Sequence, residues 1–188
     1  MEQDQSQYLA QYEEKLMLHL LRQATDNGFL DGQLLEIAEL DEKWHTSAPE
    51  YMAAAVPQIA EYPSVAVAWA GYLGMGAAVL WDTAWDDYVD VDDFYTLISK
   101  TRGFDEMDEY VMEGLLSYAL DSEEADRLES LMRGLAHSAQ GMIRKENIEA
   151  QSVMAFHIFA RTTKVFYRLG VSIALRELGY RYEKMLAD

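Results

Sequence analysis

The chain has 188 residues, of which 50% are hydrophobic, with three prolines, eleven glycines and no cysteine. This composition is typical of one folded globular domain, and the missing thiols exclude a disulfide scaffold, a thiolate metal site and a cysteine nucleophile. The formal net charge of −18 argues against binding to nucleic acid or to an anionic membrane surface, because both would repel the chain, whereas a basic protein would be attracted.

Helical periodicity predicts three helices before the middle of the chain. Apolar residues three and four positions apart indicate a first helix over about residues 6–24, and a second is expected from near Asp31 to Trp44. Ser47 and Glu50 have the spacing of a capping box, so Ser47 is expected to begin a further short helix. Pro57 should end that helix, because proline lacks an amide hydrogen and clashes with the preceding turn.

The middle of the chain predicts a long central helix that begins at Pro63. No charged residue occurs from Pro63 to Trp81, and the segment is built largely from alanine and glycine rather than from the larger residues that favour a membrane span. Ala66, Ala70 and Gly74 recur every four positions, so they share a face that a neighbouring backbone can approach closely. We therefore expect this helix to be buried at the centre of a globular protein rather than in a membrane.

Further helices are expected in the C-terminal half. A short one over about Asp92–Lys100 comes first, Asp105 and Asp121 should cap the next two, and a last long helix should span roughly Gln151 to Leu178. No run has the alternation and the β-branched residues of a strand. The expected fold is all-α: a single domain over residues 1–188, a bundle of about six to eight helices around the buried Ala/Gly-rich central helix.

Charged residues are segregated along the chain. No lysine or arginine occurs between Lys43 and Lys100, and no acidic residue occurs between Glu149 and Glu177. We therefore expect the acidic middle of the chain and its basic C-terminal part to face one another.

The end of the central helix and the last helix carry the candidate polar residues. Asp82 and Asp86 lie four positions apart and should share one helix face, while basic residues of the last helix follow at spacings of four, three and four. Such a basic stripe needs partners or water, because burying unpaired charge is costly. The predicted polar seam or pocket consists of Trp81, Asp82, Trp85, Asp86, Asp90, His157, Arg161, Lys164 and Arg168.

Two interpretations of this seam remain open. As a structural network, its ion pairs would fix how the two helices pack. As a pocket, its cations would hold an anionic group and its carboxylates would supply a base or bind a metal. Asp86–Asp90 has the aspartate-rich pattern with which helical isoprenoid synthases hold Mg²⁺ and a diphosphate, but the sequence has no second such motif and no zinc-protease motif. No metal, cofactor or catalytic residue is assigned.

Three stretches together resemble a known family: AWAGYLGMGAAVLWDTAWDDY at 68–88, RGFDEMDEYV at 102–111 and FHIFARTTKVFYRLG at 156–170. They are similar to a family of small all-helical bacterial proteins, over a region from about Tyr62 to the C-terminus. The resemblance implies a helical fold. No activity, ligand or partner is established for that family, so it implies no functional residue.

Two functions of different classes are compatible with these patterns. The first is a cytoplasmic binding or interaction protein without catalysis, which would use its acidic surface or a pocket in the bundle, with a basic protein or a second copy of itself as partner. The alternative is a metal-dependent enzyme, or a binder of a phosphorylated small molecule, at the Asp82/Asp86/Asp90–Arg161/Arg168 seam. A cytoplasmic location is expected because the N-terminus is acidic and polar, without the basic-then-apolar order of a secretory signal.

Overall fold

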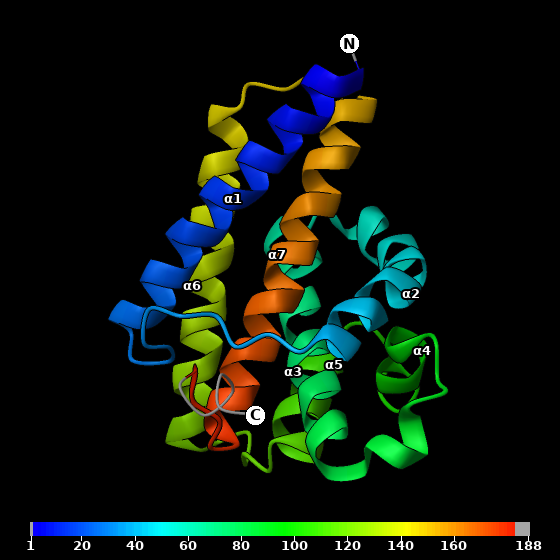
Figure 1. The fold of residues 1–188 in the computed structure, drawn as a ribbon, viewed down its shortest axis with the longest axis vertical. Coiled ribbons are helices and arrows are strands. Elements are labelled where there is room, and N and C mark those ends of the chain that lie inside the picture. Colours follow the sequence, from blue (N-terminus) through cyan, green and yellow to red (C-terminus); the bar gives the residue numbers. More distant parts are fainter. Residues whose placement is uncertain (1, 183–188) are drawn as a thin grey trace.

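The computed structural model describes residues 2–182 as helices joined by short loops, with no β-strand among these residues (Figure 1). The all-α prediction is therefore confirmed. The elements are α1 (Glu2–Asp26), α2 (Ala38–Ala55), the 3₁₀ turn η1 (Val56–Gln58), α3 (Pro63–Tyr88), α4 (Phe94–Ser99), α5 (Met107–Glu109), the π-helical turn η2 (Tyr110–Leu115), α6 (Glu123–Lys145) and α7 (Val153–Glu177).

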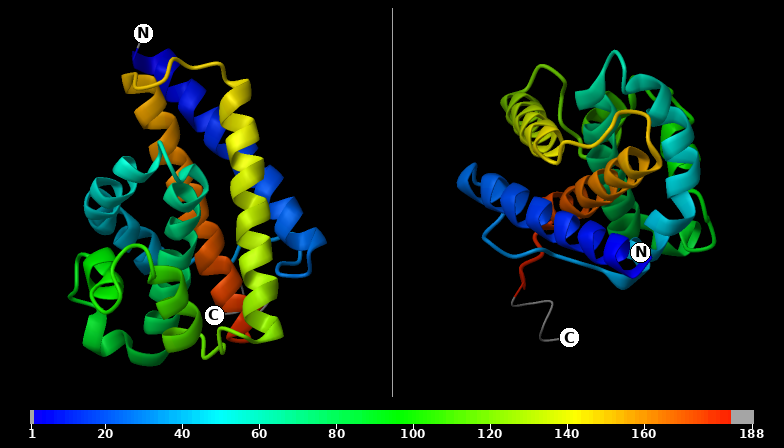
Figure 2. Two further views of the ribbon diagram at one scale, coloured as in Figure 1. Left: turned by 180° about the vertical axis from the view of Figure 1, so that it is seen from behind. Right: turned by 90° about the horizontal axis from the view of Figure 1, so that it is seen from above.

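Helices α3 and α7 form the centre of the bundle and run in the same direction. Gly71 of α3 meets Gly170 of α7, and Trp81 near the end of α3 packs against Tyr180 just beyond α7. Helices α1 and α6 cover one side of this pair, and α2 and α4 cover the other (Figures 1 and 2). A single cluster of buried side chains joins all the long helices.

Glycines bring α3 and α7 into backbone contact. A Cβ on Gly170 would lie 1.9 Å from the carbonyl oxygen of Gly71, and one on Gly74 would lie 2.1 Å from the carbonyl oxygen of Tyr167. Only residues without a side chain fit there. The predicted close approach at Gly74 is confirmed, and Gly71 and Gly170 extend it beyond the residues that the four-residue repeat picked out.

Helix α3 has the length and composition of a membrane span, yet it lies within the bundle. Its most apolar window has a mean hydropathy of 1.4, and 72% of that window is buried by the rest of the chain. Tyr51 of α2 donates its hydroxyl to the carbonyl oxygen of Ala66 in α3 (2.6 Å), which joins the two helices within the core. The buried Nε1 of Trp69, also in α3, has no hydrogen-bond partner among the described residues.

The expected start of the second helix at Asp31 is wrong, because residues 27–37 form a loop and α2 begins only at Ala38; the expected helical conformation of residues 38–44 is confirmed. Gly32 in this loop has a φ of +89°, which no regular helix allows. The Oγ of the buried Ser172 in α7 accepts from the amide of Leu35 (3.0 Å) and donates to its carbonyl (2.9 Å). A tertiary partner thus satisfies the backbone groups that a helix would have paired.

The capping box at Ser47 is also wrong, because α2 continues through this residue. The buried Ser47 Oγ instead accepts a hydrogen bond from the amide of Phe94 (2.9 Å), so it ties α4 to α2. The boundaries set by proline are confirmed: α2 ends at Ala55, just before Pro57 in η1, and α3 begins at Pro63.

The expected caps lie close to the observed ones, except in one segment. Ser122, rather than Asp121, caps α6, and Asp93 caps α4. No long helix follows Asp105, because the segment after it forms the short α5 and the π-helical η2.

Candidate functional site

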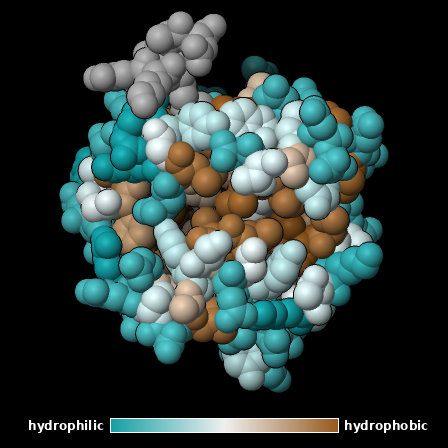
Figure 3. Space-filling view, turned by 90° about the horizontal axis from the view of Figure 1, so that it is seen from below, coloured by the Kyte–Doolittle hydropathy of each residue, from teal (hydrophilic) through white to brown (hydrophobic). Residues whose placement is uncertain are grey.

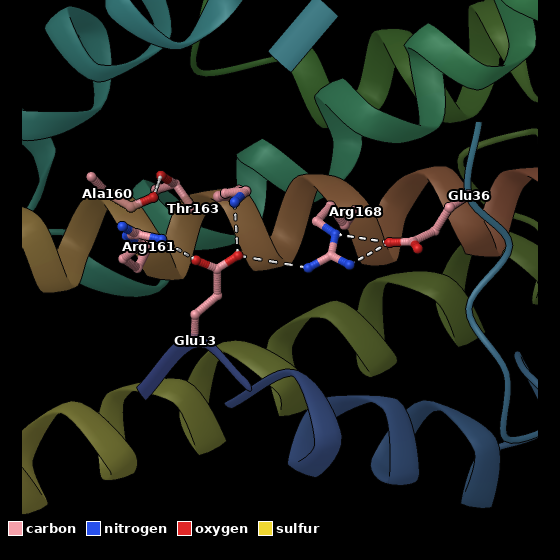
Figure 4. Close-up of polar contacts among 7 residues, drawn as sticks. Glu13, Glu36, Ala160, Arg161, Thr163 and Arg168 are labelled. Carbon is pink, nitrogen blue, oxygen red and sulfur yellow. Dashed lines mark hydrogen bonds and ion pairs between the residues drawn. The ribbon is translucent and has the colours of Figure 1, made fainter. Parts of the chain in front are cut away.

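The basic stripe of α7 binds a glutamate of α1 rather than the acidic end of α3 (Figure 4). Arg161 Nη1 lies 2.6 Å from Glu13 Oε2, and Lys164 Nζ lies 2.9 Å from Glu13 Oε1. Arg168 is 3.7 Å from the same Oε1 and donates from Nε to Glu36 Oε1 (3.0 Å) in the loop before α2. The expected partner of the stripe is therefore corrected from Asp82 and Asp86 to Glu13 and Glu36.

Glu13 is nearly buried, and its surroundings favour the ionised form. Burial alone would raise the pKa of the Glu13 carboxyl, but hydrogen bonds from Arg161 and Lys164 outweigh burial and hold the pKa below its ordinary value. Nearby, burial and the charge of Glu36 raise the pKa of Asp41, against the effect of Arg168. The cluster is a network of mutually satisfied charges joining α1 to α7. This observation favours the structural interpretation of the basic stripe.

The parallel direction of α3 and α7 explains why the predicted seam does not form. Gly71 lies opposite Gly170, Asp82 lies eleven residues beyond Gly71, and Arg161 lies nine residues before Gly170. At 1.5 Å per residue the two side chains are displaced along the bundle by about 30 Å. The basic stripe also faces α1, whereas α3 packs against the face of α7 that carries Gly170.

A break in α3 separates the acidic residues from one another. Ala84 has φ −153° and ψ 37°, so Asp82 and Asp86 do not share the continuous helix face that their spacing predicts. Before the break, Asp82 accepts a hydrogen bond from the hydroxyl of Tyr180 (2.6 Å), and Trp81 packs against the same tyrosine at a ring separation of 5.6 Å.

The acidic segment after the break is tied down by a lysine of α2. Lys43 Nζ donates to the carbonyl oxygens of Val89 (2.6 Å) and Val91 (2.7 Å), and it lies 5.7 Å from the ring centre of Trp85. Asp86 and Asp90 are exposed. Within residues 2–182, no three histidine, aspartate or glutamate side chains are placed so that they could hold a metal ion.

His157, the remaining residue of the predicted seam, takes no part in the ion pairs of Glu13. It is half-buried near the start of α7, and its ring packs against that of Phe156 at a centroid separation of 6.1 Å. The structure thus brings together Arg161, Lys164 and Arg168 around Glu13 and separates them from Asp82 and the acidic residues that follow it. His157 lies one turn before Arg161 on α7 and forms none of these ion pairs.

An apolar groove, which the sequence patterns did not reveal, opens where η1 and the first turn of α3 meet the end of α6 and the start of α7. Its volume is about 710 Å³, within the range of pockets that hold small molecules. Its lining residues are Val56, Ile59, Ala60, Pro63, Val67, Gln140, Ile143, Arg144, Ile148, Ala150, Gln151, Ser152, Ala155, Phe156, Ile158 and Phe159.

Large apolar side chains remain exposed around this groove. Val56, Ile59 and Phe156 line it and are among the most exposed large hydrophobic residues of the chain. Tyr62 and Val153, which are exposed too, adjoin lining residues in the sequence. A signal was present in the sequence, since apolar residues flank Pro57, but only the packing of α6 and α7 shows that they face one hollow.

A few polar groups lie among the apolar residues of the groove. Gln140 donates from Nε2 to Ser64 Oγ (2.5 Å), and Ser152 caps α7 by accepting from the amide of Ala155 (3.1 Å). Gln151 has a φ of +62°, a left-handed conformation that is strained for a residue other than glycine. Among residues 2–182, Arg144 is the only charged residue that lines the groove.

The hollows at the other end of the bundle are less suited to a ligand. Figure 3, which views the molecule from below, shows apolar residues gathered around a hollow within a hydrophilic ring. The cavity between Leu116, Tyr118, Leu128 and Ile173 has a volume of only about 60 Å³. A polar hollow of about 360 Å³ lies between α1 and α6. The groove at the start of α7 is therefore the candidate site.

No protein-family model matches the chain, and neither the curated proteins nor the solved structures contain a match to it.

Proposed function

We propose that the protein is a non-catalytic binding protein whose groove between η1, α3, α6 and α7 takes an apolar small molecule. The observation that carries this proposal is the groove itself: a volume of about 710 Å³ with a mostly apolar lining. Ligand pockets in proteins typically have this size and combine apolar walls with a few placed polar groups.

The exposed apolar rim supports the same function. Leaving Val56, Ile59 and Phe156 in contact with water is unfavourable, and a ligand that covers them would recover about 25 cal/mol for each Å² of apolar surface removed from water. Exposed apolar surface that gathers in one place, rather than scattered singly, is typical of binding sites.

The enzyme alternative lacks the geometry that it needs. Its cations, Arg161 and Arg168, are bound to Glu13 and Glu36, and they lie about 30 Å and about 20 Å along the bundle from Asp82. A binding function requires none of these residues to come together.

A displacement experiment tests the proposal. A neutral fluorescent probe, N-phenyl-1-naphthylamine, is bound to the protein and displaced by straight-chain alcohols of increasing length. Because each buried CH₂ group contributes about 0.8 kcal/mol, affinity should rise about fourfold for each added carbon until the groove is full.

Two aspartate variants provide the comparison. Phe156→Asp places a charge in the groove and should weaken probe binding at least tenfold, whereas Leu18→Asp should leave it unchanged. The two side chains are similarly exposed (49% and 58%), but Leu18 lies on α1 away from the groove. Equal probe binding by both variants would refute the proposal.

The Phe156→Asp variant also distinguishes a small-molecule ligand from a protein partner. If a second copy covered the groove, light scattering would show a concentration-dependent dimer that Phe156→Asp abolishes. A basic protein attracted by the net charge of −18 would bind equally well to Phe156→Asp and would be released by salt. Either result, without probe binding, would replace the small-molecule proposal.

A further inference from the structure

We propose that the ligand of this groove is an amphiphile with a single carboxylate, whose chain lies against the apolar lining and whose head binds Arg144. This inference rests on the proposed function and specifies its ligand class.

The charge of the lining differs from that of the whole protein. The chain contains 33 acidic and 15 basic residues, yet the described residues that line the groove include one arginine and no acidic residue. The nearest acid after Arg144 in the sequence, Glu146, accepts a hydrogen bond from the hydroxyl of Tyr8 in α1. The lining itself therefore has one positive charge and no negative charge, while the exposed Glu61 and Glu149 adjoin lining residues in the sequence.

Arg144 is placed to receive a ligand's head group. It lies in the last turn of α6, beside the apolar walls, and its side chain is exposed. Among the described residues, Arg102, Arg133, Arg161 and Arg168 form ion pairs with glutamates, and Arg144 forms none. Arg22, Arg127 and Arg176 form none either, but only Arg144 lines the groove. Its planar fork of N–H donors matches the two oxygens of a carboxylate.

A single cation favours a singly charged head. One guanidinium balances one carboxylate, whereas a phosphate monoester would leave uncompensated negative charge on a protein that already has a net charge of −18. The amides of Gln140 and Gln151 add hydrogen-bonding groups to the lining, but no second positive charge.

The test compares ligands of one chain length and different heads: dodecanoate, dodecanol and dodecylammonium, each below its micelle concentration, at pH 7.5. Dodecanoate should bind about fivefold more tightly than dodecanol, which is the upper range for a solvent-exposed ion pair. Dodecylammonium should bind most weakly, and added salt should reduce the preference for the acid.

Variants of two adjacent residues distinguish a direct contact between Arg144 and the carboxylate from a general electrostatic attraction by nearby positive charge. Arg144→Gln should reduce the affinity for dodecanoate to that for dodecanol without changing the latter. Lys145→Gln removes the same charge from the neighbouring position, which does not line the groove, and should keep most of the preference.

The possible failures are distinguishable. Equal binding of dodecanoate and dodecanol, or a preference that survives Arg144→Gln, would overturn the carboxylate inference and leave the proposed function standing. If none of the three ligands displaced the probe, the proposed function itself would fail. Tightest binding of dodecylammonium would show that the sign of the inferred head group is wrong.

Discussion

Gly71 and Gly170 lie so close together that a methyl group on Gly170 would fall 1.9 Å from the carbonyl oxygen of Gly71. This contact sets the spacing of the two central helices. It also sets their register, which places Asp82 beside Tyr180. The basic stripe of α7 therefore pairs with Glu13 of α1 instead of with Asp82.

Replacing Gly170 with alanine should destabilise the fold strongly. The added carbon meets backbone rather than a flexible side chain, so α3 and α7 must separate, and we expect a loss of about 3 kcal/mol or more in the free energy of unfolding. Urea denaturation of the variant measures this change.

Gly141→Ala is the matched control for this substitution. A Cβ on Gly141, in α6, would meet nothing within 4 Å, so alanine should stabilise the protein by up to about 1 kcal/mol through its helix propensity. Opposite signs in the two variants are the expected result, and a stable Gly170→Ala protein would contradict the close contact.

Removing the carboxylate of Glu13 should destabilise the protein at neutral pH. Glu13→Gln leaves Arg161 and Lys164 without their anion, and breaking such a nearly buried pair costs about 3 kcal/mol. The neighbouring exposed Glu14→Gln should change stability by less than about 0.5 kcal/mol.

The effect of Glu13→Gln should depend on pH. The folded-state pKa of Glu13 lies below the ordinary value of 4.5, so its stabilisation is fully present above pH 4.5 and is lost as the pH falls through the folded-state pKa. The difference in melting temperature between the variant and the parent should therefore shrink in acid. A difference that stays constant from pH 7 to pH 3 would contradict the ionised pair.

The carboxyl of Asp108 should affect stability in the opposite sense to that of Glu13, because its pKa is raised rather than lowered in the folded protein. Burial, together with the charges of Glu109 and Glu129, raises its pKa from 3.8 to about 6, so the ionised carboxylate is disfavoured in the folded state. This penalty is present above pH 6 and disappears as the pH falls from 6 towards 3.8.

Asp108→Asn should therefore stabilise the protein at pH 7.5, by about 1 kcal/mol once solvent screening is allowed for. The gain should vanish near pH 4. Asp105→Asn removes an equal charge from an exposed position, so it measures how much stability is gained simply by lowering the net negative charge. If Asp105→Asn gave the same gain with the same pH dependence, the specific role of burial at Asp108 would be disproved.

Lys43→Met should loosen the segment after α3. The carbonyl oxygens of Val89 and Val91 would lose their donor, so amide exchange around residues 89–93 should accelerate, with a loss in stability of about 1 kcal/mol. Lys15→Met, an exposed change on α1, should leave exchange in this segment unaltered. Unchanged exchange in the Lys43 variant would contradict its tying role.

Local features were predicted better than contacts. Pro57 and Pro63 mark helix boundaries because a missing amide and a fixed φ act within a single turn. Ser47 shows the limit of the same reasoning: the pattern of a capping box was present, but α2 continues, and the serine found its partner at Phe94, forty-seven residues away.

The candidate groove could not be predicted from periodicity. Phe156 and Ile59 belong to different elements, and each appears in the sequence as an ordinary apolar residue of a helical segment. Only the meeting of η1, α6 and α7 leaves both beside one unfilled space.

The sequence by itself determined that the chain is helical, that an Ala/Gly-rich helix lies at its centre and that Gly74 faces a close neighbour, because helix propensity and side-chain size act within a few residues. Only the tertiary structure decided which charges meet. The parallel packing of α3 and α7 separates Arg161 from Asp82 and brings it to Glu13, and it leaves the groove at the start of α7 open. Helix direction and register follow from the sum of packing contacts across the bundle, and no single stretch of sequence contains that sum.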